Sequence, residues 1–300
     1  MKLLVVLTGP TGVGKTRLSL KLAEFLNSPV ISCDSRQMYR EMRIGTAAPD
    51  TGDLEAVEHF FIGNLSIHDY YNAARFETEA LALLDKLFVD HDVLLMTGGS
   101  MFYIDAVCFG IDDMPDVDPQ LRKELEESFE KKGLSELLGQ LKLLDPEYYH
   151  AVDKKNHKRV LHALEICLMT GKPFSAFHRN TPKKRSFDVL KICLNRDRAE
   201  LYRRIDQRVL LMVQQGLVEE ARSLYPYRSL NALNTVGYQE LFDYFEGKCS
   251  LEEAISKIQF NTHKYARKQL TWFRKDRDYH WLHPDREQDI LDLIQNRLNK

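Results

Sequence analysis

The chain contains 300 residues, of which 44% are hydrophobic, and its formal net charge of −2 points to no particular partner. This length suits one large α/β domain or two smaller ones. No apolar run approaches the length of a membrane span, no signal peptide is evident, and the five cysteines lie far apart without a Cys-x-x-Cys pair. We therefore expect a cytoplasmic protein without a membrane segment, zinc site or disulfide framework.

The first predicted unit is a strand, a glycine-rich loop and a helix. Residues 3–7 are an apolar run with strand character, and 16–25 have the apolar spacing of a helix. The segment between them is a Walker A loop, which reads Gly9-Pro10-Thr11-Gly12-Val13-Gly14-Lys15-Thr16. Its backbone N–H groups can surround a di- or triphosphate, Lys15 can reach the terminal oxygens and the Thr16 hydroxyl can ligate Mg²⁺. The sequence therefore predicts phosphate binding at a helix N-terminus.

A carboxylate follows the second predicted strand, at residues 29–33. We expect this strand to lie next to the strand of residues 3–7, so that Asp34 faces the bound phosphate across the cleft. Asp34 could ligate Mg²⁺, directly or through water, or accept a proton from an attacking nucleophile. The alternative is a solvated carboxylate that caps the next turn.

Strand-like and helix-like stretches continue to alternate, with a short apolar run at 59–62, a helix at 73–88 and a strand at 92–97. This alternation predicts a parallel sheet with sites at the C-terminal ends of its strands. The strand at 92–97 leads into Gly98-Gly99-Ser100 and a new helix rather than the usual Walker B acid, which favours group transfer over ATP hydrolysis. Ser100 could orient an acceptor or contact phosphate, or the glycines could serve turn geometry alone.

The pattern changes after residue 110. An acidic, Pro-containing stretch at 112–118 precedes amphipathic helices predicted at 119–131 and 134–144. A helix at 156–170 and a strand at 189–194 follow, and the chain from 198 onward is expected to be nearly all helical. The predicted fold is thus α/β: a P-loop NTPase-like parallel sheet flanked by helices, with a helical C-terminal region. Residues 1–110 and 145–300 form its core, and 111–144 are a small, inserted, all-helical subdomain.

Two basic regions favour RNA as a partner, because cations neutralise phosphates and aromatic rings stack on unpaired bases. The alternative is an ordinary solvated helix face. The second region contains the aromatic residues Phe260, Tyr265, Trp272 and Phe273. The cations of the first region are Lys154, Lys155, Lys158, Arg159, Lys172, Arg179, Lys183, Lys184 and Arg185, and those of the second are Lys257, Lys264, Arg267, Lys268, Arg274, Lys275 and Arg277.

An arginine pair lies on the predicted helix after residue 198. Arg204 and Arg208 are four residues apart and therefore share a helix face. Paired N–H donors from such residues could clamp a diphosphate. Ion pairing to nearby acids is the alternative.

Together these motifs resemble the tRNA dimethylallyltransferase family of the bacterial type, also called tRNA isopentenyltransferases. The resemblance covers nearly the whole chain, and its specificity comes from the order and spacing of the motifs. Besides the Walker A loop they are Asp34-Ser35-x-Gln37-x-Tyr39-Arg40, Ile44-Gly45-Thr46-Ala47, Gly98-Gly99-Ser100-x-x-Tyr103, Asn156-x-x-Arg159-Val160-x-x-Ala163-Leu164-Glu165, Arg204-Ile205-x-x-Arg208, Val236-Gly237-Tyr238-x-Glu240 and Tyr265-Ala266-Arg267-Lys268-Gln269-x-Thr271-Trp272-Phe273-Arg274.

The resemblance implies transfer of a dimethylallyl group from dimethylallyl diphosphate to an adenosine of tRNA. The acceptor is the exocyclic N6 amine of the adenosine 3′ to the anticodon, at tRNA position 37, in tRNAs that read codons starting with U. It also implies that residues 9–16 hold the diphosphate with Mg²⁺ on Thr16, and that Asp34, Ser100 and Arg208 are catalytic. Asp34 would accept a hydrogen bond or proton from the amine, while Arg208 stabilises the leaving diphosphate.

The family also implies a set of contacts to the tRNA anticodon stem-loop by a protein expected to be monomeric. The sequence departs from the family pattern in three ways, each of which affects individual contacts and not the reaction. Ser100 replaces Thr, His162 and His263 replace Arg, and Arg267-Lys268 reverses the usual Lys-Arg order. The implied tRNA-binding residues are Ser35, Arg36, Gln37, Arg122, Lys158, Arg159, His162, Gly237, Tyr238, Lys264, Arg267, Lys268 and Gln269.

Three other functions remain open from the sequence. A P-loop small-molecule kinase, with Asp34 activating a hydroxyl, explains the first hundred residues equally well but not the basic regions or the inserted helices. A prenyltransferase acting on free adenine nucleotides leaves the basic regions unexplained. An RNA-binding, NTPase-like module with a dead site conflicts with the intact Lys15, Thr16 and Asp34.

Overall fold

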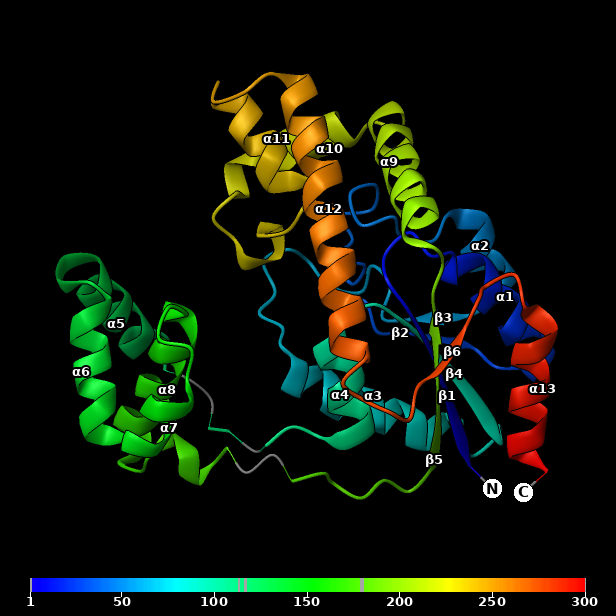
Figure 1. The fold of residues 1–300 in the computed structure, drawn as a ribbon, viewed down its shortest axis with the longest axis horizontal. Coiled ribbons are helices and arrows are strands. Elements are labelled where there is room, and N and C mark those ends of the chain that lie inside the picture. The colour runs from blue at the N-terminus through cyan, green and yellow to red at the C-terminus, as the bar shows by residue number, and fades with distance from the viewer. Residues whose placement is uncertain (1, 113, 116–117, 179–180, 300) are drawn as a thin grey trace. The chain divides into compact units, whose positions relative to one another are not determined.

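The computed structural model describes residues 2–112, 114–115, 118–178 and 181–299. The chain divides into two compact units, one formed by residues 1–108 and 184–300 and the other by 109–183 (Figure 1). Residues 113 and 116–117 of the acidic stretch, and Arg179 of the first basic region, lie outside the described residues.

The first unit is built on a parallel sheet with the strand order β3-β2-β4-β1-β5-β6 among the described residues. Every residue of β1 is buried, as expected for a central strand with helices on both faces of the sheet. The predicted P-loop-like α/β fold is confirmed. The strands are β1 (Leu3–Thr8), β2 (Val30–Ser32), β3 (His59–Phe60), β4 (Val93–Gly98), β5 (Asp188–Leu194) and β6 (His280–Leu282).

The expected strand neighbours were wrong in one place. Strand β4 lies between β1 and β2, so β2 is not adjacent to the P-loop strand. The nearly continuous apolar run of β4 suits a position with a strand on each side. The Cys33 N–H donates to the Thr97 carbonyl at 2.8 Å, which extends the β2–β4 pairing up to Asp34. The turn at 98–100 therefore lies between the P-loop and Asp34.

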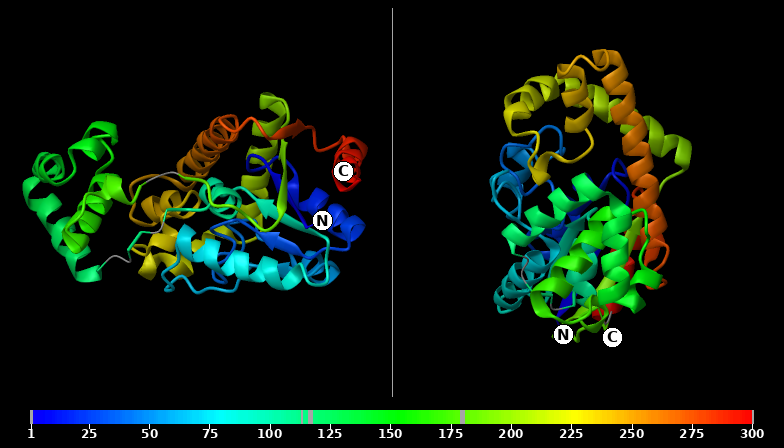
Figure 2. Two further views of the ribbon diagram at one scale, coloured as in Figure 1. Left: turned by 90° about the horizontal axis from the view of Figure 1, so that it is seen from below. Right: turned by 90° about the vertical axis from the view of Figure 1, so that its left-hand side faces the viewer.

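Helices cover the sheet of the first unit (Figures 1 and 2). On one face, Leu3, Val5 and Leu7 of β1 share a core with Leu18 and Leu22 of the first helix. The C-terminal region was predicted to be nearly all helical, but it also contains the strand β6. The sequence did not predict this strand, because three residues are too few to show an alternating pattern. The helices are α1 (Lys15–Leu26), α2 (Thr51–Ala56), α3 (Ala73–Leu87), α4 (Met101–Phe109), α9 (Arg198–Gln214), α10 (Leu217–Leu224), α11 (Tyr238–Phe245), α12 (Leu251–Phe273) and α13 (Glu287–Leu298).

Helix α12 has one buried side and one exposed side. Ser250 accepts a hydrogen bond from the Glu253 N–H, and the Glu253 carboxylate accepts one from the Ser250 N–H, which fixes the start of the helix. The buried residues recur every three or four positions and therefore form one stripe. They are Ala254, Ile258, Thr262, Ala266, Gln269 and Phe273.

The second unit is helical, and its described elements are α5 (Pro119–Lys132), α6 (Leu134–Leu144), α7 (Pro146–Ala151), α8 (His157–Thr170) and the short 3-10 helix η1 (Phe174–Ala176). It has its own core, in which Leu137 and Leu141 of α6 meet Val160 and Leu164 of α8. Because α8 buries its apolar face inside this unit, the unit extends to residue 183 and is longer than the predicted 111–144.

Candidate active site

The loop between β1 and α1 requires glycine at three positions. Gly9, Gly12 and Gly14 have φ values of +148°, +82° and +108°, which L side chains rarely adopt. A Cβ at Gly9 would also lie 2.6 Å from the Leu194 carbonyl oxygen. α1 begins at Lys15, so its first backbone N–H groups lie at the loop and can bind an anion.

Lys15 is folded over this loop. Its Nζ donates to the carbonyl oxygens of Gly9, at 2.8 Å, and Pro10, at 3.1 Å. The pKa of Lys15 is lowered to about 8, chiefly by burial and also by nearby Arg208, whereas Asp34 opposes the shift. An anion bound in the loop would favour the charged form of Lys15.

Two cavities meet at this loop. The first, of about 460 Å³, is lined by residues from the P-loop, the turn after β2, α9 and α12. The second, of about 340 Å³, includes the apolar side chains of Val209, Met212, Leu217, Val236 and Ile258 in its lining. The residues that line both are Thr11, Asp34, Thr46, Arg208 and Tyr265. Thr46 and Tyr265 were not assigned to the site from the sequence, because only the tertiary fold brings them to it.

Asp34 and Ser100 lie on neighbouring turns. Asp34 Oδ1 accepts hydrogen bonds from the N–H groups of Arg36, at 2.9 Å, and Gln37, at 3.4 Å, so this carboxylate caps a turn as well as facing the cavities. The Ser100 hydroxyl accepts from the Ser35 N–H at 2.8 Å and donates to the Ser35 hydroxyl at 3.0 Å. Ser100 is not among the described residues that line the two cavities, so its geometry suits holding the Asp34 turn.

Both arginines predicted for the site lie on helix α9 and contact the P-loop. Arg208 Nη2 donates to the Thr11 hydroxyl, and Arg204 Nε donates to the Gly12 carbonyl at 3.0 Å. Burial lowers the pKa of Arg208, and the neighbouring Asp34 opposes that shift. The shared helix face predicted for the pair is therefore aimed at the phosphate loop.

A family model described as IPP transferase matches residues 37–276 of the chain. The chain belongs to the IPP transferase family. It is 54% identical over 294 residues to tRNA dimethylallyltransferase 1 of Bacteroides fragilis, covering 98% of each chain. It is 56% identical over 292 residues to tRNA dimethylallyltransferase 2 of Porphyromonas gingivalis, covering 97% of each.

Solved structures of similar proteins agree with this assignment. A tRNA isopentenylpyrophosphate transferase from Bacillus halodurans is 33% identical, with a TM-score of 0.73, and the match covers 100% of this chain and 97% of that one. A eukaryotic dimethylallyltransferase acting on tRNA is 26% identical, with a TM-score of 0.78, and the match covers 95% of this chain and 74% of that one. The family resemblance read from the motifs is confirmed.

Several residues expected to contact tRNA through the family pattern are bonded within the protein. Gln37 Nε2 donates to the Thr46 and Ala47 carbonyls, at 3.2 and 3.0 Å. Arg36 Nη1 donates to the carbonyls of residues 231 and 232, each at 3.1 Å. Tyr238 is fully buried. Ser35, Arg36 and Gly237 nevertheless line the second cavity.

Glu220 on α10 was not found from the sequence. Its carboxylate accepts from the backbone N–H groups of Ile44 and Gly45, each at 2.8 Å, and from the Tyr238 hydroxyl at 2.7 Å. A Cβ at Gly45 would lie 2.5 Å from the Tyr238 hydroxyl, so glycine is needed there. Glu220 thus fixes the loop that carries Thr46 into both cavities.

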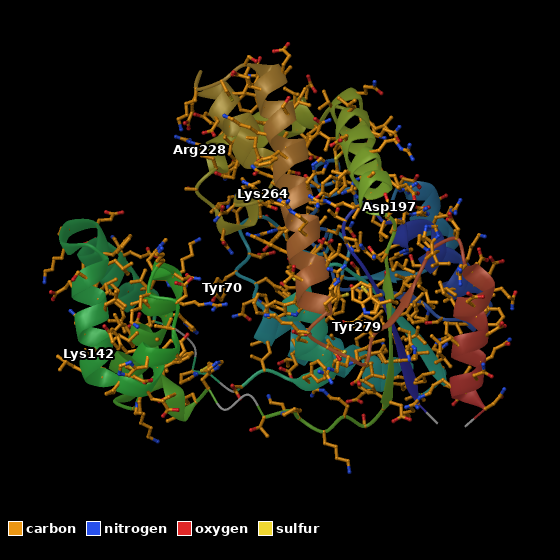
Figure 3. All side chains as sticks on the ribbon, in the orientation of Figure 1. Tyr70, Lys142, Asp197, Arg228, Lys264 and Tyr279 are labelled. Carbon is orange, nitrogen blue, oxygen red and sulfur yellow. The ribbon has the colours of Figure 1, made fainter. Side chains whose placement is uncertain are left out.

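The other predicted RNA contacts divide between the two units of this IPP transferase. On α12, Lys264 (labelled in Figure 3), Arg267 and Lys268 are exposed. Lys264 Nζ lies 4.2 Å from the centre of the exposed Phe260 ring. In the helical unit, Lys158 and Arg159 are exposed.

Arg122, in the same helical unit, forms a bidentate ion pair. Its Nε and Nη2 donate to Glu165 at 2.6 and 3.0 Å, and Glu165 is fully buried. His162 Nδ1 lies 3.3 Å from the same carboxylate. Arg122 and His162 therefore have a structural partner in addition to any RNA contact.

A metal ion would depend on few protein ligands here. Within the described ranges, no group of three or more His, Cys, Asp or Glu side chains could hold a metal ion. Thr16 and Asp34 line one cavity. This pair fits Mg²⁺, which keeps several waters and is commonly bound by one or two protein groups together with substrate phosphates.

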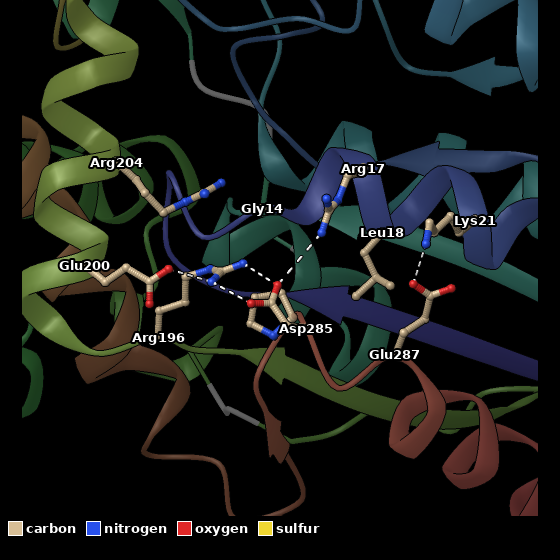
Figure 4. Close-up of a pocket in the computed structure, with 10 residues that line it drawn as sticks. Gly14, Arg17, Leu18, Lys21, Arg196, Glu200, Arg204, Asp285 and Glu287 are labelled. Carbon is tan, nitrogen blue, oxygen red and sulfur yellow. Dashed lines mark hydrogen bonds and ion pairs between the residues drawn. The ribbon is translucent and has the colours of Figure 1, made fainter.

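A third cavity, of about 530 Å³, lies beside Gly14 and the first turns of α1 (Figure 4). Its lining includes Arg196, which pairs with Glu200 at 2.6 Å and with Asp285 at 2.8 Å. Lys21 pairs with Glu287 at 2.6 Å. Because these cations already have carboxylate partners, this cavity is less suited to phosphate than the one that contains Asp34.

No helix in the described part of the chain is long and apolar enough to cross a membrane.

Proposed function

We propose that this protein is a tRNA dimethylallyltransferase that uses dimethylallyl diphosphate as donor. The acceptor is the N6 amine of the adenosine at tRNA position 37, in tRNAs that read codons starting with U. The observation that supports this most is that the phosphate loop and Asp34 line one cavity, while an adjoining cavity that shares Thr11, Asp34 and Arg208 also includes a group of apolar side chains. A diphosphate suits the first cavity, and a five-carbon chain beside a base suits the second.

The diphosphate leaves as the bond between C1 of the dimethylallyl group and oxygen breaks. Backbone N–H groups at the start of α1, the Lys15 ammonium and the Arg208 guanidinium stabilise the negative charge that develops. Thr16 would hold Mg²⁺, which would supply further neutralisation of this charge. Lys15 and Arg208 are both partly buried, which strengthens their attraction for a phosphate oxygen.

The new bond joins the adenosine N6 to C1, and N6 must lose a proton. Asp34 accepts it, a role that contributes about 10²- to 10⁴-fold in rate for a positioned base. Ser100 holds the turn that contains Ser35, so it positions Asp34. Ser35, Arg36 and Gly237 line the cavity in which the base would lie.

The exposed cations of α12 and of α8 are proposed to bind the phosphates of the anticodon stem-loop. The anticodon loop is single-stranded, so moving one base into a pocket costs little stacking energy. We propose that the enzyme acts as a monomer, since residues of one chain line both cavities. We also propose that it acts in the cytoplasm.

The proposal is tested by nucleoside mass analysis of unmodified tRNA after incubation with the protein, Mg²⁺ and dimethylallyl diphosphate. We expect an adenosine species heavier by one dimethylallyl group. If no tRNA yields this product and the protein instead phosphorylates a small acceptor with ATP, the proposal is overturned in favour of a kinase. The relatives named as tRNA dimethylallyltransferases do not favour the kinase.

A further inference from the structure

The Gln269 side chain bridges the two glycine turns of the site. Its Oε1 accepts a hydrogen bond from the Thr11 N–H at 2.9 Å, and its Nε2 donates to the Gly99 carbonyl at 2.8 Å. Gln269 is only 1% exposed. Both ends of the amide are thus used, and a direct contact of Gln269 with tRNA would require breaking this bridge.

The bridge connects the parts of the site that handle the two substrates. Thr11 belongs to the phosphate loop and also receives the hydrogen bond from Arg208. Gly99 is followed by Ser100, whose hydroxyl bonds Ser35 beside Asp34. One side chain of α12 therefore connects the diphosphate loop to the turn that holds Asp34, the proposed general base.

Helix α12 is also fastened to the element that follows the second turn. Trp272 Nε1 donates to Asp105 Oδ2 of α4 at 2.8 Å, and its ring packs edge-to-face on Phe102 with centroids 4.8 Å apart. The same helix exposes Lys264 and Lys268. A shift of α12 would therefore move both the P-loop at Thr11 and the turn at Gly99.

We propose that Gln269 is a positioning residue that sets the spacing between the diphosphate and the acceptor amine, and so couples the RNA-facing helix to transfer. This inference depends on the proposed function. Small misplacements of reacting groups lower rates strongly, so the loss of the bridge should act on kcat. A glutamine suits the position because one end must accept and the other must donate.

The first test is Gln269→Met, which keeps the approximate volume and removes both hydrogen bonds. We expect kcat for transfer to fall about 10- to 100-fold, while the tRNA Kd is unchanged. Gln259→Met is the matched control, because Gln259 on the same helix bonds only the Asp206 carbonyl, at 3.4 Å, among the described residues. Gly99→Ala disturbs the same bridge from the other side, since its Cβ would lie 2.4 Å from Gln269 Nε2.

The second test is Gln269→Glu, compared with wild type across a pH range. A protonated carboxyl group can donate to Gly99 and accept from Thr11, whereas a carboxylate can only accept. We therefore expect the ratio of the variant's kcat to that of wild type to rise as the pH falls, with no such trend for Gln269→Met. The charged and titratable groups that line the same cavity are unchanged in these variants: Lys15, Arg17, Asp34, Arg204, Arg208 and Tyr265.

Wild-type kcat in a folded Gln269→Met variant would overturn the inference, as would weaker tRNA binding with unchanged kcat. A flat ratio for Gln269→Glu would also overturn it, even if Gln269→Met failed to fold. Failure of the proposed function is distinguishable, because the wild-type protein itself would then form no prenylated adenosine.

Discussion

The Ser35 backbone N–H donates to the Ser100 hydroxyl at 2.8 Å, which joins the turn after β2 to the turn after β4. The same hydroxyl donates to the Ser35 side chain at 3.0 Å, so Ser100 is bonded twice to the residue that follows Asp34. A residue expected to contact substrate therefore has a position suited to orienting Asp34, the proposed general base.

Replacing Ser100 with Ala should lower kcat about 5- to 30-fold, because the loss of two hydrogen bonds to Ser35, of about 1 kcal/mol each, frees the Asp34 turn. Ser100→Thr keeps the hydroxyl and should retain most of the activity. Steady-state kinetics of dimethylallyl transfer provides the measurement. Equal kcat values for the Ala and Thr variants would show that the hydroxyl has no part in positioning.

Asp34→Ala should leave tRNA binding close to wild type and reduce transfer about 10²- to 10⁴-fold, because the proton acceptor is lost. Asp34→Asn is the informative control. Its side-chain oxygen can still accept from the Arg36 N–H, as Oδ1 does now at 2.9 Å, but it cannot take up a proton. Single-turnover transfer and tRNA-binding assays give the two readouts, and undiminished transfer in either variant would contradict the proposed base.

Lys15 predicts a pH dependence of the step that captures the donor. Burial lowers its pKa to about 8, so the free enzyme loses this positive charge as the pH rises through that value. We expect kcat/KM for dimethylallyl diphosphate to fall above about pH 8, while kcat falls less because bound diphosphate favours the ammonium form. Lys15→Arg should flatten the kcat/KM profile. A wild-type profile that stays level through this range would refute the assignment.

The parts of the site that depend on local sequence could be predicted, and those that depend on tertiary contacts could not. The Walker A loop needs glycines and a lysine at fixed spacing, so its conformation follows from its own residues. The order of β2 and β4 is set by pairing between distant segments. The Gln269 bridge likewise joins residues 258 positions apart. The spacing of apolar residues along the chain cannot predict such a contact.

Glu220→Gln should destabilise the first unit and reduce transfer together. The carboxylate accepts three hydrogen bonds, whereas an amide has one oxygen and would direct its NH₂ group toward another donor. We expect the free energy of unfolding to fall by about 1–3 kcal/mol, with lower kcat because Gly45 and Thr46 line the site. Denaturant titration and kinetics measure both effects. Glu219→Gln, at the exposed neighbouring position, should change neither. An equal effect of the two variants would rule out a role for Glu220 in fixing the loop that carries Thr46.

Arg122→Ala should destabilise the helical unit, because it leaves the fully buried Glu165 without its bidentate partner. The expected loss is about 1–3 kcal/mol, less than for a wholly buried pair because Arg122 is 39% exposed. Adding Glu165→Gln should recover part of this stability, since a neutral amide needs no counter-charge. Thermal unfolding of the single and double variants, alongside tRNA binding, separates two roles. If binding recovers with stability, Arg122 acts through the fold; if both variants bind equally weakly, Arg122 contacts tRNA directly.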